Sequence, residues 1–117
     1  FNNAEQFNGF KLILKNFNDI SQKDLNILGK NVMKYSEDII AIFVSSLKNG
    51  MLILGMIRQQ PSNKLSFNMG SFIKSISQNF NGKGGGSIDY GQGFIENPKI
   101  KGKELIHLIR KNLEEFL

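Results

Sequence analysis

Residues 39–57 read IIAIFVSSLKNGMLILGMI, which is two apolar runs joined by a short polar turn. The first run, residues 39–44, is almost wholly apolar and largely β-branched, a pattern typical of a strand buried on both faces of a sheet. Asn49-Gly50 lies between the two runs and favours a tight hairpin, because both residues tolerate positive φ. The sequence therefore predicts a central β-hairpin whose return strand covers residues 51–57.

The segment before this hairpin predicts a strand followed by a helix. Residues 10–17 alternate in hydropathy with a period of two, as a strand with one mainly apolar face does. Ser21 is followed three positions later by Asp24, which is close to the capping box that opens many helices. Apolar residues then recur every three or four positions as far as Lys34, which predicts an amphipathic helix.

The segment after the hairpin predicts a second helix, a short strand and a third helix. Residues 58–64 include Pro61 and are interpreted as a surface loop. Apolar residues recur at helical spacing over residues 69–80 and 105–116, and residues 90–95 between them favour a strand. We therefore expect an α/β (α+β) fold in which helices cover a mixed sheet, in the order strand, helix, strand, strand, helix, strand, helix.

Length and composition fit one domain and exclude several kinds of active site. The chain has 117 residues, of which 40% are hydrophobic and 21% charged, as in an ordinary globular domain. It has no cysteine, which excludes disulfides, thiolate zinc sites and cysteine nucleophiles. The single histidine, His107, falls on the polar face of the last predicted helix. The sequence therefore argues against catalysis within this chain, and we expect one domain over residues 1–117.

The charge balance favours a polyanionic partner. The chain has 15 Lys and Arg against 10 Asp and Glu, which gives a net charge of +5 and a pI of about 9.6. Such an excess attracts polyanions by long-range steering and counterion release. No apolar run reaches the ~18 residues of a membrane helix and no signal peptide opens the chain, so we expect a cytoplasmic protein. Since the first residue is Phe1 rather than Met, we also expect the chain to be a piece of a longer one.

Glycine is concentrated in residues 81–93, which read NGKGGGSIDYGQG and hold half of the chain's 12 glycines. Two interpretations are open. Successive N–H groups in the triple glycine would form a concave nest for anionic oxygens, and Lys83 would add a positive charge. Alternatively, the glycines end the preceding helix, with Gly82 as its left-handed terminal residue. A Walker loop and a dinucleotide fingerprint are excluded, because Lys83 is followed by glycine and the run follows a helix.

This glycine run carries a family resemblance. Residues 82–93 are similar to the glycine motif of the DHH-associated domain, in the form found at the C-terminus of alanyl-tRNA synthetases. The family pattern has glycine, lysine and three glycines, then two variable residues, aspartate, a large apolar residue, a small residue, glutamine and small residues. The resemblance extends over nearly the whole chain, because the first strand, the capped helix, the apolar hairpin and the later helices occur in the family's order.

The resemblance implies a function. In that family the module is not catalytic; it grips the outer corner of tRNA, where the D and T loops meet, and so supports aminoacylation and editing. It implies no cofactor in this chain, whereas the parent, an alanine-tRNA ligase or a free-standing editing protein, would use ATP, Mg and Zn. The implied partners are alanine-specific tRNA and the parent's other domains. An oligomer would form through a preceding helical segment, for which this chain has too few residues before Phe10.

The candidate tRNA-binding residues follow from the motif and from nearby basic residues. They are Lys83, Gly84, Gly85, Gly86, Ser87, Asp89, Gln92, Arg58 and Lys64. Lys83 would reach a phosphate, and Asp89 would either accept a hydrogen bond from a ribose 2′-OH or cap backbone N–H groups in its own turn. Tyr90 would either stack on an exposed base or belong to the core. Arg58 and Lys64 would either track phosphates or be ordinary surface charges.

One departure from the family pattern bears on the alternatives. Ser87 and Ile88 stand where the family often has arginine and proline, so we expect no basic contact at position 87. DHH phosphoesterases carry a related domain that typically has histidine directly after the glycines, and Ser87 at that place favours the synthetase form. The alternative functions are a substrate-binding domain of such a phosphoesterase and an oligomerisation or docking module.

Overall fold

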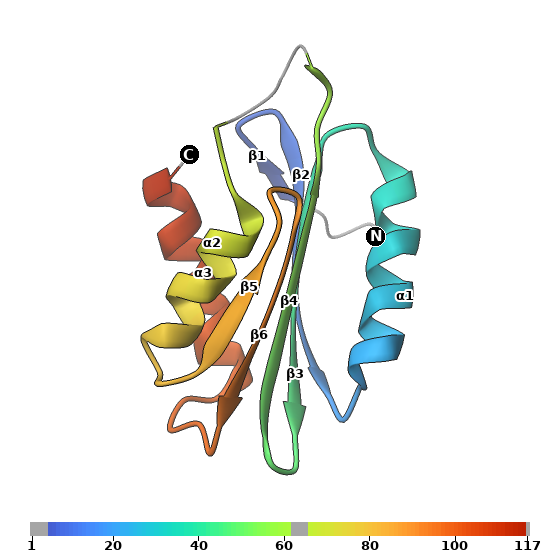
Figure 1. Cartoon of the computed structure of the whole chain (residues 1–117). Coiled ribbons are helices and arrows are strands. Elements are labelled where there is room, and N and C mark those ends of the chain that lie inside the picture. Colours follow the sequence, from blue (N-terminus) through green and yellow to red (C-terminus); the bar gives the residue numbers. More distant parts are fainter. Residues whose placement is uncertain (1–4, 62–65, 117) are drawn as a thin grey trace.

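A computed structural model describes residues 5–61 and 66–116 of the chain. Within them the chain forms a six-stranded sheet and three α-helices (Figure 1). In chain order the elements are β1 (Glu5–Phe7), β2 (Phe10–Asn18), α1 (Gln22–Val32), the short 3-10 helix η1 (Met33–Tyr35), β3 (Ile39–Leu47), β4 (Gly50–Arg58), α2 (Met69–Gln78), β5 (Lys83–Gly86), β6 (Tyr90–Glu96) and α3 (Gly102–Phe116).

The sheet is mixed, as the sequence predicts. Its strand order is β1-β2-β3-β4-β6-β5, and only the β2–β3 pair among these neighbours is parallel. A parallel pair needs a crossover connection, and α1 supplies it by returning the chain from the end of β2 to the start of β3. The central strands β3 and β4 are almost wholly buried, which confirms the interpretation of residues 39–57.

The helices cover the two faces of the sheet unequally. In Figure 1, α1 lies on one side of the sheet and α2 and α3 lie on the other. Helix α1 packs on β3 and β4, α2 on β4, β5 and β6, and α3 on β2 and β3. Each layer encloses its own apolar core, so β3 sends Ile40 and Ile42 toward α2 and α3 and sends Ala41 and Phe43 toward α1. The side of β5 and β6 that faces away from α2 is the part of the sheet that we call the open face.

Helices α1 and α2 each begin with a side-chain cap, of which only the one at Ser21 was predicted. Ser21 Oγ accepts a hydrogen bond from the backbone N–H of Asp24 at 3.2 Å, which confirms the cap of α1. The Asn68 side chain does the same for Ser71 at the start of α2, at 3.0 Å. A side-chain acceptor at this position satisfies one of the free N–H groups of the first helical turn.

The central hairpin turns one residue earlier than predicted. Leu47 pairs with Gly50, so the two turn residues are Lys48 and Asn49, and neither has positive φ. Gly50 belongs to β4, where a Cβ atom would overlap the ring of Phe94 and lie 2.5 Å from the carbonyl oxygen of Ile95. The prediction of positive φ at Asn49-Gly50 is therefore wrong: the glycine there serves the close approach of β6.

An Asn-Gly turn with positive φ does occur, at the other end of the sheet. Asn8 has φ 49° and Gly9 has φ 84°, and they connect β1 to β2. These angles are typical of the two-residue turns that match the twist of an antiparallel pair. Strand β1 was not predicted from the sequence, and it is only three residues long.

Candidate functional site

The triple glycine is a strand at the edge of the sheet. Residues Lys83–Gly86 form β5, which pairs antiparallel with β6 and has no neighbour on its other side in the described sheet. Along a strand the N–H groups alternate between the two edges, whereas a nest needs successive N–H groups that converge. The predicted concave nest is therefore wrong, and any ligand would meet an extended, nearly side-chain-free edge.

Most glycines of this region allow α2 to lie directly against β5 and β6. A Cβ at Gly93 would overlap Ser77 Oγ on α2, and one at Gly91 would lie 2.8 Å from the carbonyl oxygen of Met69. On the helix, a Cβ at Gly70 would lie 2.6 Å from the carbonyl carbon of Gly86. Real Cβ atoms are not found so close to backbone atoms, so these glycines have a packing reason.

Gly85 is different. An added Cβ at Gly85 would meet nothing within 4 Å. Gly85 pairs with Gln92 across β5 and β6, and directly paired residues project from the same face of a sheet. Its missing side chain therefore leaves space on the open face, beside Gln92, and neither packing nor a positive φ requires glycine there.

The end of α2 uses a different residue from the predicted one. Asn81, with φ 60°, is the left-handed residue after the helix. Gly82 does not have positive φ, but its N–H donates to the carbonyl of Ser77 at 2.8 Å. A Cβ at Gly82 would lie 2.5 Å from the carbonyl oxygen of Phe94. The prediction that Gly82 is the left-handed terminator is therefore wrong, and close packing on β6 is its reason.

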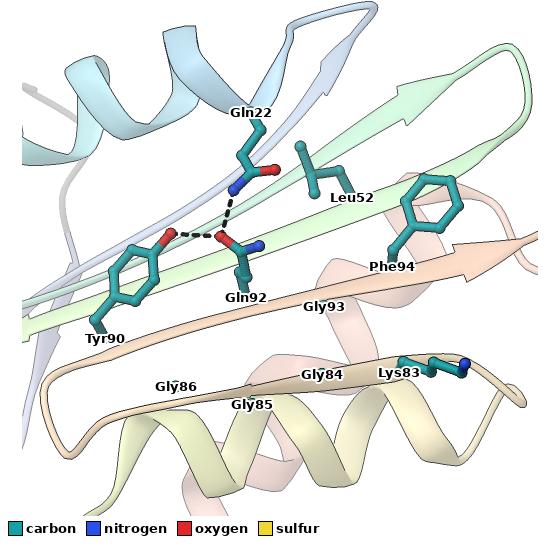
Figure 2. A pocket seen from close by; sticks show the side chains of 10 residues that line it. All are labelled: Gln22, Leu52, Lys83, Gly84, Gly85, Gly86, Tyr90, Gln92, Gly93 and Phe94. Carbon is teal, nitrogen blue, oxygen red and sulfur yellow. Dashed lines mark hydrogen bonds between the residues drawn. The ribbon is translucent and has the colours of Figure 1, made fainter.

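A pocket of about 620 Å³ lies on the open face (Figure 2). Its lining comes from four elements: the strand Lys83–Gly86, residues of β6 that include Tyr90, Gln92 and Phe94, Leu52 of β4, and Gln22 at the start of α1. The floor is thus a sheet surface with apolar and amide groups, and the first turn of α1 forms a wall.

Four polar side chains are connected across this pocket. Gln22 Nε2 donates to Gln92 Oε1 at 2.6 Å, and the hydroxyl of Tyr90 lies 2.7 Å from the same oxygen and 3.0 Å from Asn26 Oδ1. Figure 2 shows Gln22 reaching down from α1 to Gln92, with Tyr90 alongside. Residues 64 to 70 positions apart thereby connect α1 to the open face.

This connection can reverse its direction. The Tyr90 hydroxyl has one hydrogen, so it donates to Asn26 or to Gln92 but not to both at once. When the hydroxyl donates to Asn26, the Gln92 side-chain amide can rotate so that its NH2 group donates to the phenol oxygen. The Gln22 amide then rotates as well, so that its oxygen accepts a hydrogen bond from Gln92. Gln92 can therefore present either a donor or an acceptor to a group that enters the pocket.

Tyr90 is part of both the core and the pocket. It is half-buried and packs on the core beneath α1, while its hydroxyl lies at the pocket wall. Burial raises the pKa of Tyr90 above 10.0, and the hydrogen bond with Asn26 offsets part of that effect. The phenol therefore stays protonated at neutral pH. The packing agrees with the prediction that Tyr90 belongs to the core, and stacking of a base on its ring stays a prediction.

Lys83 lies at one end of the pocket and is exposed. It pairs with Phe94, so its side chain leaves the sheet on the open face beside that ring, as Figure 2 shows. No described Asp or Glu forms an ion pair with it. Its ammonium group is exposed, and its contact with a phosphate stays a prediction.

Ser87 and Asp89 belong to the turn between β5 and β6, outside the pocket lining. The Ser87 hydroxyl donates to Asp89 Oδ1 at 3.0 Å, so the carboxylate bonds within its own turn, although to a hydroxyl rather than to the expected backbone N–H. The carbonyls of Ser87 and Ile88 accept from the N–H groups of Gly70 and Met69 at 2.8 and 2.9 Å. The turn therefore fixes the start of α2.

The remaining basic candidates are not in the pocket. Arg58 ends β4, and its Nη1 donates to the carbonyl oxygen of Met33 at 3.1 Å, just after α1. Leu52 of β4 pairs with Phe94, which in turn pairs with Lys83. Arg58 lies at the other end of β4, roughly 20 Å along the strand from Leu52. Lys64 lies outside the described residues.

Sequence reasoning missed the contribution of α1. Gln22 and Asn26 have no motif around them, and their partners Gln92 and Tyr90 lie far away in the sequence. The one available signal was position: both precede the buried Leu25 and Gly29 by three residues, which places them together on one flank of the helix.

Among the described residues there is no cluster of three or more His, Cys, Asp and Glu that could hold a metal ion. His107 is exposed on α3, which agrees with the prediction that it lies on the polar face of this helix. Over residues 5–61 and 66–116, no helix is long and apolar enough to cross a membrane.

Fold and site together define a small α+β module with one open, basic-edged sheet face. The same fold occurs in the C-Ala domain of alanyl-tRNA synthetase from Aquifex aeolicus, with a TM-score of 0.75 and 19% sequence identity over 92% of this chain and 95% of that chain. No protein-family model matches the chain.

Two curated proteins are similar in sequence. The alanine-tRNA ligases of Thermoanaerobacter sp. (strain X514) and Thermoanaerobacter pseudethanolicus are each 28% identical to the chain over 97 residues. That alignment covers 83% of this chain but only 11% of each ligase. These similarities confirm the resemblance to the alanyl-tRNA synthetase domain that the glycine run carries.

Proposed function

We propose that the chain is a tRNA-binding module of an alanyl-tRNA synthetase and that tRNA docks on the open face of β5 and β6. The similarity to alanine-tRNA ligases and to the C-Ala fold supports the parent protein. The net charge of +5 supports an anionic partner. Residues 1–117 would then be one non-catalytic domain, a piece of a longer chain.

The observation that carries the proposal is the vacant space at Gly85. Where glycine is needed for packing, the structure gives a neighbour that excludes a Cβ, but at Gly85 there is none within 4 Å. A glycine that packing does not require fits a surface where another molecule approaches the backbone closely. Lys83 two residues earlier supplies a cation for a phosphate.

The chemistry of the pocket suits an RNA corner. Tyr90 and Phe94 offer ring surface for an unstacked base or a ribose, and Gln92 can act as donor or acceptor toward a base edge. Gly84, Gly85 and Gly86 present backbone. The Asp89 carboxylate accepts from Ser87 at Oδ1 and keeps lone pairs that would accept from a ribose 2′-OH.

The finer roles rest on the family resemblance. We propose that the module grips the tRNA elbow, where the D and T loops meet, and that it supports aminoacylation and editing by holding one alanine-specific tRNA for both. ATP, Mg and Zn would be used by other domains of the parent and not by this chain. The other domains of the parent would be its second kind of partner, and the cytoplasm its compartment.

Two alternatives remain. A substrate-binding domain of a DHH phosphoesterase would have histidine after the glycines, where this chain has Ser87. An oligomerisation or docking module would use the unpaired edge of β5, since exposed strand edges pair readily with other strands. Light scattering with and without tRNA separates that second alternative from RNA binding.

The test is tRNA affinity as a function of salt. Lys83→Ala should weaken binding and flatten the plot of log affinity against log salt by about one unit, because one phosphate contact is lost. Gly85→Val should weaken binding with little change in slope, since it fills the pocket without removing charge. Lys103→Ala, an exposed lysine on α3, is the matched control. If Lys83→Ala and Gly85→Val both bind as wild type, the open face is not the tRNA site.

A further inference from the structure

The outer edge of β5, the side away from β6, consists of backbone groups. The N–H of Ser87 donates to the carbonyl oxygen of Tyr90 at 2.7 Å, which makes these two residues a hydrogen-bonded pair. In an antiparallel ladder such pairs alternate with pairs whose N–H and C=O groups point away from each other. Counting back along β5, Gly84 and Gly86 are therefore the residues that direct these groups to the outer edge, where the described sheet has no further strand.

Helix α2 runs beside this edge in a fixed alignment. A Cβ at Gly70 would lie 2.6 Å from the carbonyl carbon of Gly86, and one at Gly84 would lie 3.2 Å from the Cα of Lys74. Gly70 and Lys74 are four positions apart, so they lie in one row along the helix. This row therefore runs antiparallel to β5, and Figure 2 shows the helix alongside the strand.

Lys74 places a positive charge at the outer edge. It is exposed, and its backbone lies against Gly84. Helical side chains lean toward the N-terminus of their helix, which for Lys74 is the direction of Gly86. No described Asp or Glu forms an ion pair with Lys74. The turn after β5 contains one acid, Asp89, whose Oδ1 accepts from Ser87.

Two lysines stand on opposite sides of β5. The Lys83 side chain leaves the sheet on the open face, whereas Lys74 belongs to the helix that packs on the other face. The outward N–H groups of Gly84 and Gly86 lie at the rim between these two faces. Backbone N–H groups at a sheet edge bind anionic oxygens, and neighbouring ammonium groups strengthen such binding.

We propose that RNA docked on the open face continues over the outer edge of β5 to Lys74, which binds a backbone phosphate there. The inference rests on the proposed function and adds a residue of α2 that lies outside the glycine motif. The N–H groups of Gly84 and Gly86 donate to phosphate oxygens, and their carbonyl groups accept from ribose 2′-OH groups. A β-strand of another chain also fits such an edge, but the two lysines favour a polyanion.

The first test uses Lys74→Ala with tRNA as ligand over a range of salt. Loss of one phosphate contact should flatten the slope of log affinity against log salt by about one unit, and Lys74→Arg should keep the wild-type slope. Alanine suits an exposed position within a helix, so the variant should fold. The matched control is Lys103→Ala, which removes the same charge from α3. Lys74→Ala/Lys83→Ala should flatten the slope by about two units, because separate phosphates are lost.

Hydrogen exchange of single amides gives a second readout. The Gly84 and Gly86 amides point outward, whereas Gly85 forms a hydrogen-bonded pair with Gln92. Binding of tRNA should therefore slow exchange at Gly84 and Gly86 by about fivefold or more, and should change Gly85 less. A simple loss of charge at Lys74 does not produce this alternation.

The possible results separate the two proposals. If Lys74→Ala and Lys103→Ala have the same slope, Lys74 makes no specific contact and the inference is wrong, while a flattened slope in Lys83→Ala keeps the open face as the site. Unchanged exchange at Gly84 and Gly86 in the complex also overturns the passage of RNA over the edge. Wild-type binding by Lys83→Ala and Gly85→Val would instead remove the open face as the docking site, and with it the path from that face to Lys74.

Discussion

At the scale of the residue, glycines that look alike in the sequence have opposite surroundings. Gly93 lies against Ser77 of α2, whereas Gly85, on the neighbouring strand, faces open space. Both belong to strands that pair with one another, so backbone conformation does not distinguish them. Only the position of α2 does, and for this reason the motif could be recognised from sequence while the separate reasons for its glycines could not.

This contrast predicts different effects on stability. Gly93→Ala should lower the free energy of unfolding by about 1 to 3 kcal/mol, because the new methyl group overlaps Ser77 and forces helix and sheet apart. Gly85→Ala should leave it unchanged or raise it by about 0.4 to 1 kcal/mol, since the unfolded chain loses freedom and the folded state has room. Urea unfolding measures both. Equal losses would contradict the assignment of Gly85 to the open face.

The raised pKa of Tyr90 predicts that the free energy of unfolding depends on pH in the alkaline range. Burial raises its pKa in the folded state above the unfolded value of 10.0, so above that pH the folded protein binds more protons than the unfolded one. The stability from this shift is complete below pH 10.0 and is lost as pH rises through the folded pKa. The free energy of unfolding of wild type should thus fall relative to Tyr90→Phe between about pH 9 and about pH 11. A difference that stays constant would contradict burial of the phenol.

At the scale of the element, α1 both completes the fold and shapes the site. Its first turn carries Gln22, whose amide reaches Gln92, and the cap that begins this turn is Ser21. Ser21 therefore determines where the helix begins, and the hydrogen bond of Gln22 connects α1 to the open face.

Ser21→Ala should therefore destabilise the fold by about 1 kcal/mol, the usual effect of removing an N-cap oxygen. Ser75→Ala is the control, because Ser75 is exposed within α2 and alanine there favours the helix slightly. Thermal unfolding should lower the Tm of the first variant and leave that of the second at or above wild type. Equal Tm values would mean that the cap does not stabilise α1.

Elements with side-chain patterns were predictable, and those without them were not. The buried hairpin β3–β4 and the capped helix α1 follow from β-branched runs, apolar periodicity and Ser21. Strand β5 consists of Lys83 and three glycines, so it carries no alternation from which a strand could be inferred. The Gln22–Gln92 contact depends on the crossover that places α1 beside β6, which no local pattern encodes.

At the scale of the whole molecule, unequal coverage of the sheet creates the site. Helices α2 and α3 share one face of the sheet, while α1 alone packs on the other, over β3 and β4 (Figure 1). The face of β5 and β6 beside α1 is left open, and Lys83 stands at one end of it. The net charge of +5 adds long-range attraction to an RNA partner.

The most direct measurement of the central claim is an amide chemical-shift titration of the isotope-labelled chain with tRNA. The account predicts the largest changes at the backbone amides of Lys83, Gly85, Tyr90 and Gln92, and small changes over α3. Large changes confined to α3 and the outer side of α2, with residues 83–94 unaffected, would contradict it.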